Sequence, residues 1–303
     1  MQKFRGVYAI LATPFDEERN LDIPSLESLV EFEIKAGVHG ITILGILGEV
    51  HRLSDEERSI VTSTVVKAAN GRIPIISGTG ASGTDVARLY TKEAVEQGVS
   101  GVMIAPPRLV KPNDDAIVAY FSEIAKQCKV PIIVQDEPAT YGVYFSVELI
   151  ARLAKIEGVR YIKLEDPPTP MKISKIRAAV DSDFGIFGGL GGLYCYEELK
   201  RGASGIMTGF AYPEFLCQIY GLVESGNPEK ARDLFYKVLP LIRYEAQPLV
   251  SLPIRKEILK LRGAIKNSTT RPPSTKLDSA DRKELDEIIT TLRLTETIAE
   301  LVA

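Results

Sequence analysis

Lys163 is the residue of this sequence whose type and position point most directly to chemistry. It lies in the segment Tyr161–Asp166 (YIKLED), between the apolar residues Ile162 and Leu164. In a β-strand, Lys163 would face one way and both of these neighbours the other. A lysine that faces a barrel interior is desolvated, and desolvation favours the neutral amine that attacks a ketone to form a Schiff base. The alternative is a lysine at a strand end whose ammonium group extends into solvent.

Glu165 lies two residues beyond Lys163 and would share its face of the strand. A carboxylate at this position is suited to general acid–base catalysis beside an imine. It could equally form an ion pair that makes the burial of Lys163 possible, with no part in the reaction. The pattern leaves both roles of Glu165 open.

Two glycine-rich segments follow apolar runs and could bind a carboxylate group. One is Gly45–Val50 (GILGEV), and the other is Gly188–Gly192 (GGLGG), which precedes a predicted helix at Tyr194–Arg201. Glycines leave backbone N–H groups accessible, and such groups bind anions. The alternative is that these glycines serve only the geometry of turns.

These residues lie at the ends of short apolar runs, which predict β-strands buried on both faces of a parallel sheet. Each run is followed by a polar turn and a helical pattern, and Ser54 with Glu57 forms a capping box that predicts a helix over Ser54–Ala69. The eight runs are Val7–Ala12, Gly40–Leu44, Pro74–Ser77, Gly101–Ala105, Pro131–Gln135, Val159–Leu164, Phe184–Gly188 and Gly205–Thr208.

Eight consecutive βα units predict an α/β fold, a (β/α)₈ TIM barrel, in which reactive groups lie at the carboxyl-terminal ends of the strands. A doubly wound sheet is the alternative, but the first predicted strand is followed by no GxGxxG phosphate-binding loop. From about Pro213 the strand pattern stops. Helical patterns follow at Glu214–Glu224, Pro228–Tyr244, Pro253–Leu261 and Ser279–Leu292. The stretch Lys266–Lys276, between the last two, is predicted to be a loop. We therefore expect a catalytic barrel domain over residues 1–225 and a C-terminal helical region over residues 226–303 that packs on it.

The composition argues against several classes of function. The chain has 303 residues, a net charge of −3 and a pI near 5.7, so it presents no basic field to a nucleic acid. Its cysteines (Cys128, Cys195 and Cys217) and histidines (His39 and His51) have neither disulfide-framework nor metal-ligand spacing. We find no targeting segment and no apolar run of about 18 residues. The sequence thus predicts a cytoplasmic enzyme with no metal, no cofactor and neither a membrane nor a nucleic-acid partner.

Taken together, the segments resemble the dihydrodipicolinate synthase/N-acetylneuraminate lyase superfamily of class I Schiff-base lyases. The similarity covers nearly the whole chain and is carried by Gly6–Pro14, Gly45–Glu49, Ile76–Gly80, Pro138, Lys163 and Gly205–Thr208. It implies a TIM barrel and an imine between Lys163 and a small-molecule 2-oxo acid, whose carboxylate binds the backbone of Ile46 and Leu47. It also implies a homo-oligomer, a dimer or a tetramer.

The sequence departs from the synthases of this superfamily at four places. Two threonines in the loop after the second strand are replaced by Ile46 and Leu47, and the tyrosine that relays protons falls on Gln135. The arginine that holds the second substrate falls on Thr140, and a tyrosine pair at the end of the fourth strand falls on Pro106–Pro107. The sequence therefore lacks both the tyrosine that relays protons and the arginine that holds the second substrate.

The sequence is more similar to a branch of the superfamily that dehydrates 2-keto-3-deoxy sugar acids, in particular to L-2-keto-3-deoxyarabonate dehydratase-like proteins. The shared strings are VQDEP at Val134–Pro138, YIKLEDP at Tyr161–Pro167 and the segment Gly202–Glu214. The resemblance predicts dehydration of such an acid as the main function.

In the predicted reaction, Lys163 forms the imine, Glu165 takes a proton from C3, the C4 hydroxyl leaves as water, and Gln135 orients the reacting groups. The predicted substrate-binding residues are Gly45, Ile46, Leu47, Gly48, Glu49, Gly189, Gly191 and Thr208. Three alternatives stay open: a pyruvate-dependent aldolase, a dihydrodipicolinate synthase-type enzyme, and a non-catalytic 2-oxo acid sensor.

Overall fold

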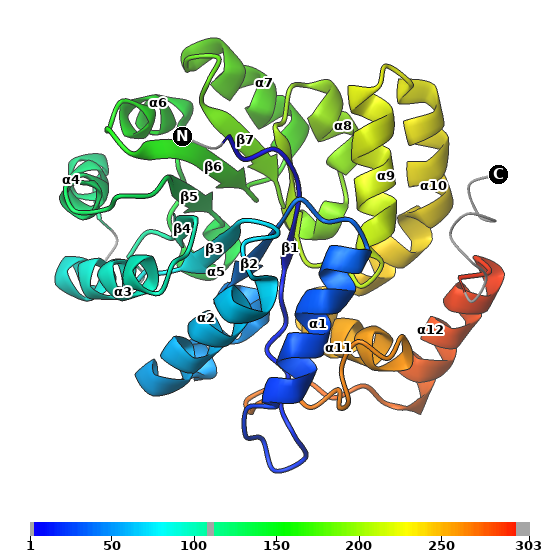
Figure 1. Ribbon diagram of the computed structural model, residues 1–303. Helices are drawn as coiled ribbons and strands as arrows, with labels where there is room; N and C mark the ends of the chain where they lie inside the picture. Colours follow the sequence, from blue (N-terminus) through cyan, green and yellow to red (C-terminus); the bar gives the residue numbers. More distant parts are fainter. Residues whose placement is uncertain (1–2, 108–111, 295–303) are drawn as a thin grey trace.

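Eight parallel strands form a closed barrel in chain order, with the helices outside it (Figure 1). The structure, a computed structural model, describes residues 3–107 and 112–294. The strands are β1 (Gly6–Ile10), β2 (Gly40–Ile43), β3 (Ile75–Gly78), β4 (Gly101–Ile104), β5 (Ile132–Asp136), β6 (Val159–Leu164), β7 (Gly185–Gly188) and β8 (Gly205–Thr208). The predicted TIM barrel is confirmed, and the doubly wound sheet is excluded because β1 pairs with β8.

The strands are buried along almost their whole length, because the barrel core covers one face and the helices cover the other. In β6, Arg160 is the one exposed residue. The predicted runs agree with the strands to within one or two residues at each end. The run Val7–Ala12, for example, overshoots β1, because Leu11 and Ala12 continue as buried apolar chain after the strand has ended.

Large side chains fill the barrel interior below the carboxyl-terminal ends of the strands. Phe4 stacks on Tyr161 with ring centroids 5.2 Å apart, and its backbone N–H donates to the Tyr161 hydroxyl at 2.8 Å. Tyr8 meets Phe187 edge-on at 5.2 Å. These rings pack in one buried cluster with the apolar side chains of Ile10, Ile76, Met103, Ile133 and Met207. A ligand inside the barrel therefore has room at the carboxyl-terminal end.

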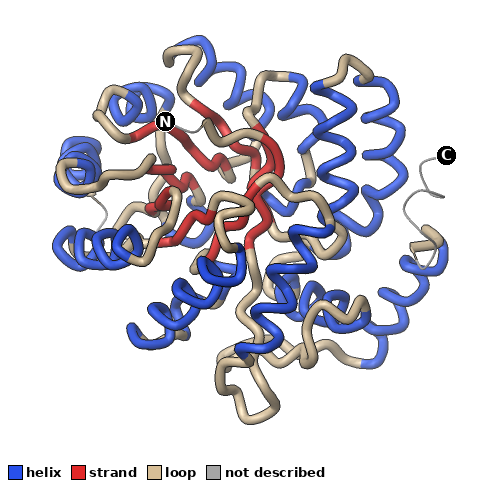
Figure 2. The backbone as a smooth tube through the Cα atoms, in the orientation of Figure 1, coloured by secondary structure: helices blue, strands red, loops and turns tan. Residues whose placement is uncertain are grey.

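Helices enclose the strands (Figure 2). They are α1 (Ile23–Lys35), α2 (Asp55–Ala69), α3 (Thr84–Glu96), α4 (Asp114–Ala125), the short α5 (Pro138–Tyr141), α6 (Val147–Ala154), α7 (Thr169–Ala179) and α8 (Cys195–Lys200). The capping box predicted at Ser54 is present, since its hydroxyl accepts from the Glu57 N–H and the Glu57 carboxylate accepts from the Ser54 N–H. The loops of the described part of the chain contain three 3₁₀ turns: η1 (Ile46–Gly48), η2 (Val50–Arg52) and η3 (Leu190–Gly192).

From the end of β8 to residue 294 the chain forms helices and the segments that connect them, as predicted. Helix α9 (Pro213–Glu224) packs against β1, and α10 (Pro228–Glu245) lies beside α9 (Figure 1). Helices α11 (Ser251–Leu261) and α12 (Ser279–Thr291) are joined by a segment without helix or strand, which includes the predicted loop Lys266–Lys276. Among the described residues, no helix is both long enough and apolar enough to cross a membrane. The division at residue 225 stays a prediction.

Barrel closure at Gly205 yields a first prediction. A Cβ atom at this position would lie 2.0 Å from the carbonyl oxygen of Gly6 on the neighbouring strand, and neither backbone can retreat without opening the barrel. Gly205→Ala is expected to lower the free energy of unfolding by about 3 kcal/mol or more, measured by urea titration. The matched control is Gly221→Ala in α9, where an added Cβ meets nothing within 4 Å. It should be neutral or stabilise by about 0.5–1 kcal/mol, because alanine favours a helix. Equal stability of the two variants would contradict this account of closure.

Candidate active site

Lys163 lies inside the barrel near the carboxyl-terminal end of β6. Its pairing partners across the sheet are Gln135 on β5 and Phe187 on β7. Tyr161, two residues earlier, belongs to the aromatic interior, so alternation along β6 turns Lys163 to the same side. The residue is only 3% exposed, which rules out the alternative of a lysine that extends into solvent.

Glu165 brings a carboxylate to Lys163. Its Oε2 atom lies 2.8 Å from Lys163 Nζ and 3.1 Å from Gln135 Nε2. The backbone N–H of Glu165 donates to the Asp136 carbonyl at 2.8 Å, which extends the β5–β6 pairing by one residue beyond the strand. The three predicted catalytic residues therefore form one contiguous cluster. The ion pair between Glu165 and Lys163, which the sequence offered as the alternative to a catalytic role, is present. Its presence leaves the catalytic role of Glu165 open.

Strand alternation separates a second cluster of charges from this one. Asp136 follows Gln135 and faces the helical layer, where its carboxylate lies 2.6 Å from Lys172 of α7. Lys172 also contacts Asp166 at 2.8 Å. Burial raises the pKa of Asp136 to about 6, although Lys172 opposes the shift. Asp136 is thus a poor candidate for a base at Lys163, because its carboxylate is held on the other face of the sheet.

The loop after β2 forms the 3₁₀ turn η1, and its backbone is suited to an anion. The turn's own hydrogen bonds are donated by the N–H groups of Gly48, to Gly45, and of Glu49, to Ile46. The N–H groups at the start of a helical turn have no acceptor within the turn, and here these belong to Ile46 and Leu47. Leu47 also packs on the apolar interior of the barrel, so this backbone lies over the mouth of the barrel.

Glu49 anchors the same loop to the C-terminal region. Its carboxylate is completely buried and lies 2.5 Å from Lys256 Nζ of α11 and 2.8 Å from Arg52. It also accepts the backbone N–H of Arg271 at 2.9 Å. Burial lowers the pKa of Lys256 to about 8, although Glu49 opposes the shift. Glu49 was predicted to bind substrate; the structure gives its carboxylate three partners within the protein, so its evident task is to hold the loop.

The glycines after β7 make room for other side chains. A Cβ on Gly189 would lie 2.4 Å from Cγ of Glu165, so any side chain there would displace the carboxylate from Lys163. Gly191 has φ +66°, and its Cβ would lie 2.8 Å from that of Ala246. Packing alone explains both glycines, and their predicted contact with substrate stays a prediction. Thr208 is buried at the end of β8, next to the η3 turn.

A cavity of about 190 Å³ begins at Gln135 and extends over the carboxyl-terminal ends of the neighbouring strands. It is lined by apolar side chains such as Leu44 and Met103, and by four polar residues that the sequence did not single out: Arg58, His51, Ser82 and Tyr141. Arg58 donates to the carbonyl of Gly78 at 3.2 Å and stacks over the ring of Tyr90, with its guanidinium carbon 4.2 Å from the ring centre. Burial lowers the pKa of Arg58. In the sequence, Arg58 could be recognised only as a residue of the predicted helix α2. Helical spacing indicates which face of a helix is buried, but it does not indicate a function.

No cluster of three or more His, Cys, Asp or Glu side chains within residues 3–107 and 112–294 is arranged to hold a metal ion.

Comparison with known proteins agrees with this geometry. Residues 3–292 match the sequence model of the family described as the dihydrodipicolinate synthetase family. A 4-hydroxy-tetrahydrodipicolinate synthase of Rickettsia rickettsii is 32% identical over 295 residues, which cover 96% of this chain and 98% of that protein.

Solved structures are similar over the same length. The crystal structure of dihydrodipicolinate synthase from Rhodopseudomonas palustris is 34% identical, with a TM-score of 0.90 and coverage of 95% of this chain and 97% of that one. The enzyme from Acinetobacter baumannii, crystallised with pyruvate, is 28% identical, with a TM-score of 0.88 and coverage of 95% and 98%. These names agree better with the synthase-type alternative of the sequence analysis than with the sugar-acid dehydratase that it preferred.

The buried carboxyl group of Glu198 predicts how the stability of the protein depends on pH. It packs behind β7, where a Cβ on Gly188 would lie 1.8 Å from its Oε2 atom, and it accepts a hydrogen bond from Thr169. Burial raises the pKa of Glu198 to about 8 from 4.5. Between these pH values the folded protein keeps a proton that the unfolded chain has released, so stability is lost as the pH rises. Glu198→Gln should reduce the fall in unfolding free energy between pH 5 and pH 8 by about 2–4 kcal/mol.

The measurement is urea unfolding at a series of pH values, with Glu229→Gln on α10 as the control at an exposed position. The control variant should follow the wild-type pH dependence. An unchanged pH dependence in Glu198→Gln would show that this carboxyl group is already ionised in the folded protein.

Proposed function

The chain belongs to the dihydrodipicolinate synthetase family, and from this premise we propose that Lys163 forms an imine with a 2-oxo acid. The protein is a class I Schiff-base lyase of that family. The observation that carries the proposal is the position of a buried lysine amine 2.8 Å from a carboxylate that also binds Gln135, a residue that lines the cavity at the carboxyl-terminal ends of the strands. Glu165 can take the proton of the Lys163 ammonium group, and the neutral amine then adds to the C2 carbonyl and expels its oxygen as water.

The carboxylate of the 2-oxo acid is best held by the β2 loop. The backbone N–H groups of Ile46 and Leu47 are free of the turn's own hydrogen bonds and lie over the mouth of the barrel. In this proposal the side chains at positions 46 and 47 need no hydroxyl group, because the backbone is the donor. Glu49 and Lys256 keep the loop in place from below.

We propose dehydration of a 2-keto-3-deoxy acid as the reaction, because the segments Val134–Pro138 and Tyr161–Pro167 resemble those of the sugar-acid dehydratase branch. The imine makes the C3 protons acidic, and the Glu165 carboxylate takes one of them. The electron pair of the resulting enamine expels the C4 hydroxyl, which leaves as water after it accepts the proton from Glu165. A second water hydrolyses the imine and frees Lys163, so one water is lost overall. Gln135 donates a hydrogen bond to Glu165 and cannot relay a proton by ionising, because an amide does not titrate.

A second candidate is the condensation of pyruvate with an aldehyde, by a synthase or an aldolase. It is favoured by the names of the relatives, which match along nearly the whole chain. The same imine would serve as the nucleophilic enamine. Thr140, where the synthases have a substrate-binding arginine, donates its backbone N–H to Glu137 within the cap of α5 and brings no charge to the site. Loss of the relay tyrosine also leaves a non-catalytic 2-oxo acid sensor as a candidate.

We further propose a cytoplasmic homo-oligomer that uses no cofactor, because the imine itself accepts the electrons of the broken C–H bond. A panel of 2-keto-3-deoxy acids, analysed by product mass, separates the candidate reactions. Loss of one water indicates dehydration, and release of pyruvate indicates aldol cleavage. Adduct formation from pyruvate and an aldehyde indicates the synthase or aldolase reaction, and binding without turnover indicates a sensor.

The imine is tested by reduction with borohydride in the presence of pyruvate. The wild-type protein should gain the mass of one reduced adduct, and Lys163→Ala should lose both the adduct and the turnover. Lys175→Ala, which removes an exposed lysine from α7, is the control and should retain both. Normal turnover in Lys163→Ala would end the Schiff-base proposal.

The role of Glu165 is tested by Glu165→Gln, which keeps the shape of the side chain and removes its basicity. The variant should still form the reducible imine, while turnover falls by about 10²–10⁴-fold. Asp166→Asn is the control, because Asp166 pairs with Lys172 and not with Lys163, and its effect should be much smaller. If Glu165→Gln abolishes the imine itself, Glu165 serves mainly to hold Lys163 in place. If turnover is normal, another group moves the proton.

A further inference from the structure

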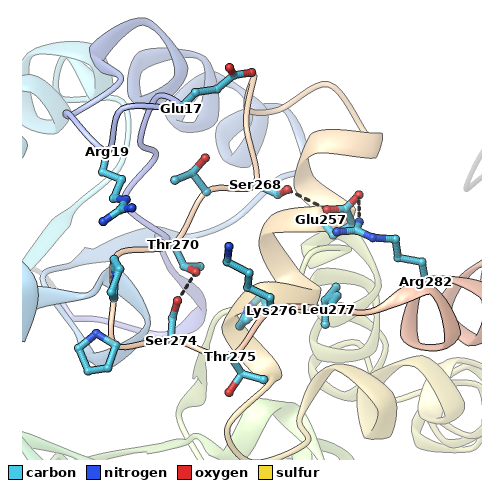
Figure 3. Close-up of a pocket in the computed structure, with 14 residues that line it drawn as sticks. Glu17, Arg19, Glu257, Ser268, Thr270, Ser274, Thr275, Lys276, Leu277 and Arg282 are labelled. Atoms are coloured by element: carbon cyan, nitrogen blue, oxygen red, sulfur yellow. Dashed lines mark hydrogen bonds and ion pairs between the residues drawn. The ribbon is translucent and has the colours of Figure 1, made fainter.

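A second cavity lies between the β1–α1 loop and the C-terminal segment that connects α11 to α12 (Figure 3). Its volume is about 690 Å³, which is within the range of small-molecule sites. Glu17 and Arg19 line one side, and α11 with residues 268–277 lines the other. Among the described residues that line it, none belongs to the Lys163 cluster. The cavity is therefore a separate feature of the fold.

Two basic side chains from different parts of the sequence line this cavity. Arg19 comes from the β1–α1 loop and Lys276 from the segment after α11, and Figure 3 shows both directed into the space between them. Within residues 3–107 and 112–294, neither side chain forms an ion pair or a hydrogen bond. Their charges are thus available to a ligand.

The acidic side chains of the cavity leave this charge largely uncompensated. Glu257 is occupied by Arg282, at 2.6 Å, and by the Ser268 hydroxyl, at 2.8 Å. Glu17 lies at the upper edge in Figure 3, with its carboxylate turned away from Lys276. The interior between Arg19 and Lys276 is therefore electropositive.

Hydroxyl groups line the floor of the same space. Thr270 and Ser274 are hydrogen-bonded to each other at 2.8 Å, and Thr275 follows them along the wall. Hydroxyl groups donate readily to phosphate and carboxylate oxygens. One hydroxyl hydrogen of the Thr270–Ser274 pair is used in their mutual bond, so the other, together with that of Thr275, is left to donate to a ligand.

The walls are held in place before any ligand binds. The Arg271 guanidinium donates to the backbone carbonyl of Arg19 at 2.8 and 3.1 Å and also binds Glu57, so it joins the two sides of the cavity. Lys256 donates to the carbonyl of Thr269 at 2.7 Å. Because these contacts fix the backbone on both sides, a ligand has to order little more than the Arg19 and Lys276 side chains.

We propose that this cavity binds a small dianion, a phosphate monoester or a dicarboxylate, between Arg19 and Lys276. The two cations would each contact one end of the anion, and the hydroxyl groups of the C-terminal segment would donate to its remaining oxygens. This site would be independent of the imine chemistry, because it shares no lining residue with the Lys163 cluster.

The test is calorimetric titration of the full chain with inorganic phosphate and, separately, with succinate at low ionic strength. The double variant Arg19→Gln/Lys276→Gln should bind the preferred anion at least about tenfold more weakly than the wild type. The control Lys67→Gln/Lys230→Gln removes the same charge at exposed positions outside the cavity and should keep the wild-type affinity. Turnover without the anion should be unchanged in both variants.

Tighter binding of phosphate would identify a phosphate monoester as the ligand class, and tighter binding of succinate would identify a dicarboxylate. Lys276→Gln alone is the fallback if the double variant does not fold, since the Lys276 side chain has no hydrogen bond to lose within the described residues. The proposal is overturned if the wild type binds neither anion, or if the cavity variant and the control lose affinity equally.

Discussion

The packing of aromatic rings at the amino-terminal end of the barrel is the constraint on which the site depends. Phe4 and Tyr161 stack across the interior, so the space for a ligand lies above them, at the carboxyl-terminal end. Tyr161 also sets the orientation of β6, because a strand that buries this ring must turn Lys163 inward two residues later. A shift of one residue would send the lysine into the helical layer and Leu164 into the site. The chemistry of Lys163 therefore rests on the packing of a ring below it.

The parts of the structure that follow from local pattern could be predicted from the sequence. Buried strands and capped helices have characteristic periodicities, so the barrel and the cap at Ser54 were found with errors of one or two residues at strand ends. The cluster of Lys163 and Glu165 was predictable for the same reason, because period-two alternation places them on one face. Gln135 was selected by resemblance to a family, and its pairing with Lys163 confirms that the two side chains are neighbours.

The parts that depend on contacts between distant residues could not be predicted in this way. Glu49 was selected with its loop, but its partner Lys256 lies 207 residues further along the chain and has no spacing that would announce the ion pair. Glu198 is similar, since its raised pKa results chiefly from burial behind Gly188, which no spacing in the sequence announces. The reaction is equally hard to predict, because one fold can host several reactions and the side chains of the site decide between them.

The anchoring of the β2 loop also has a consequence for the order in which the protein is completed during synthesis. The loop is made early, yet the carboxylate of Glu49 finds Lys256 only after another 207 residues have been translated, and it finds the backbone of Arg271 later still. Until then a buried carboxylate would lack two of its partners, so the loop has little reason to settle over the barrel. A nascent chain can therefore assemble strands before the turn that we propose to bind an anion is held in place. In that proposal, the capacity to bind a 2-oxo acid arises only once the segment that carries Lys256 and Arg271 has been made.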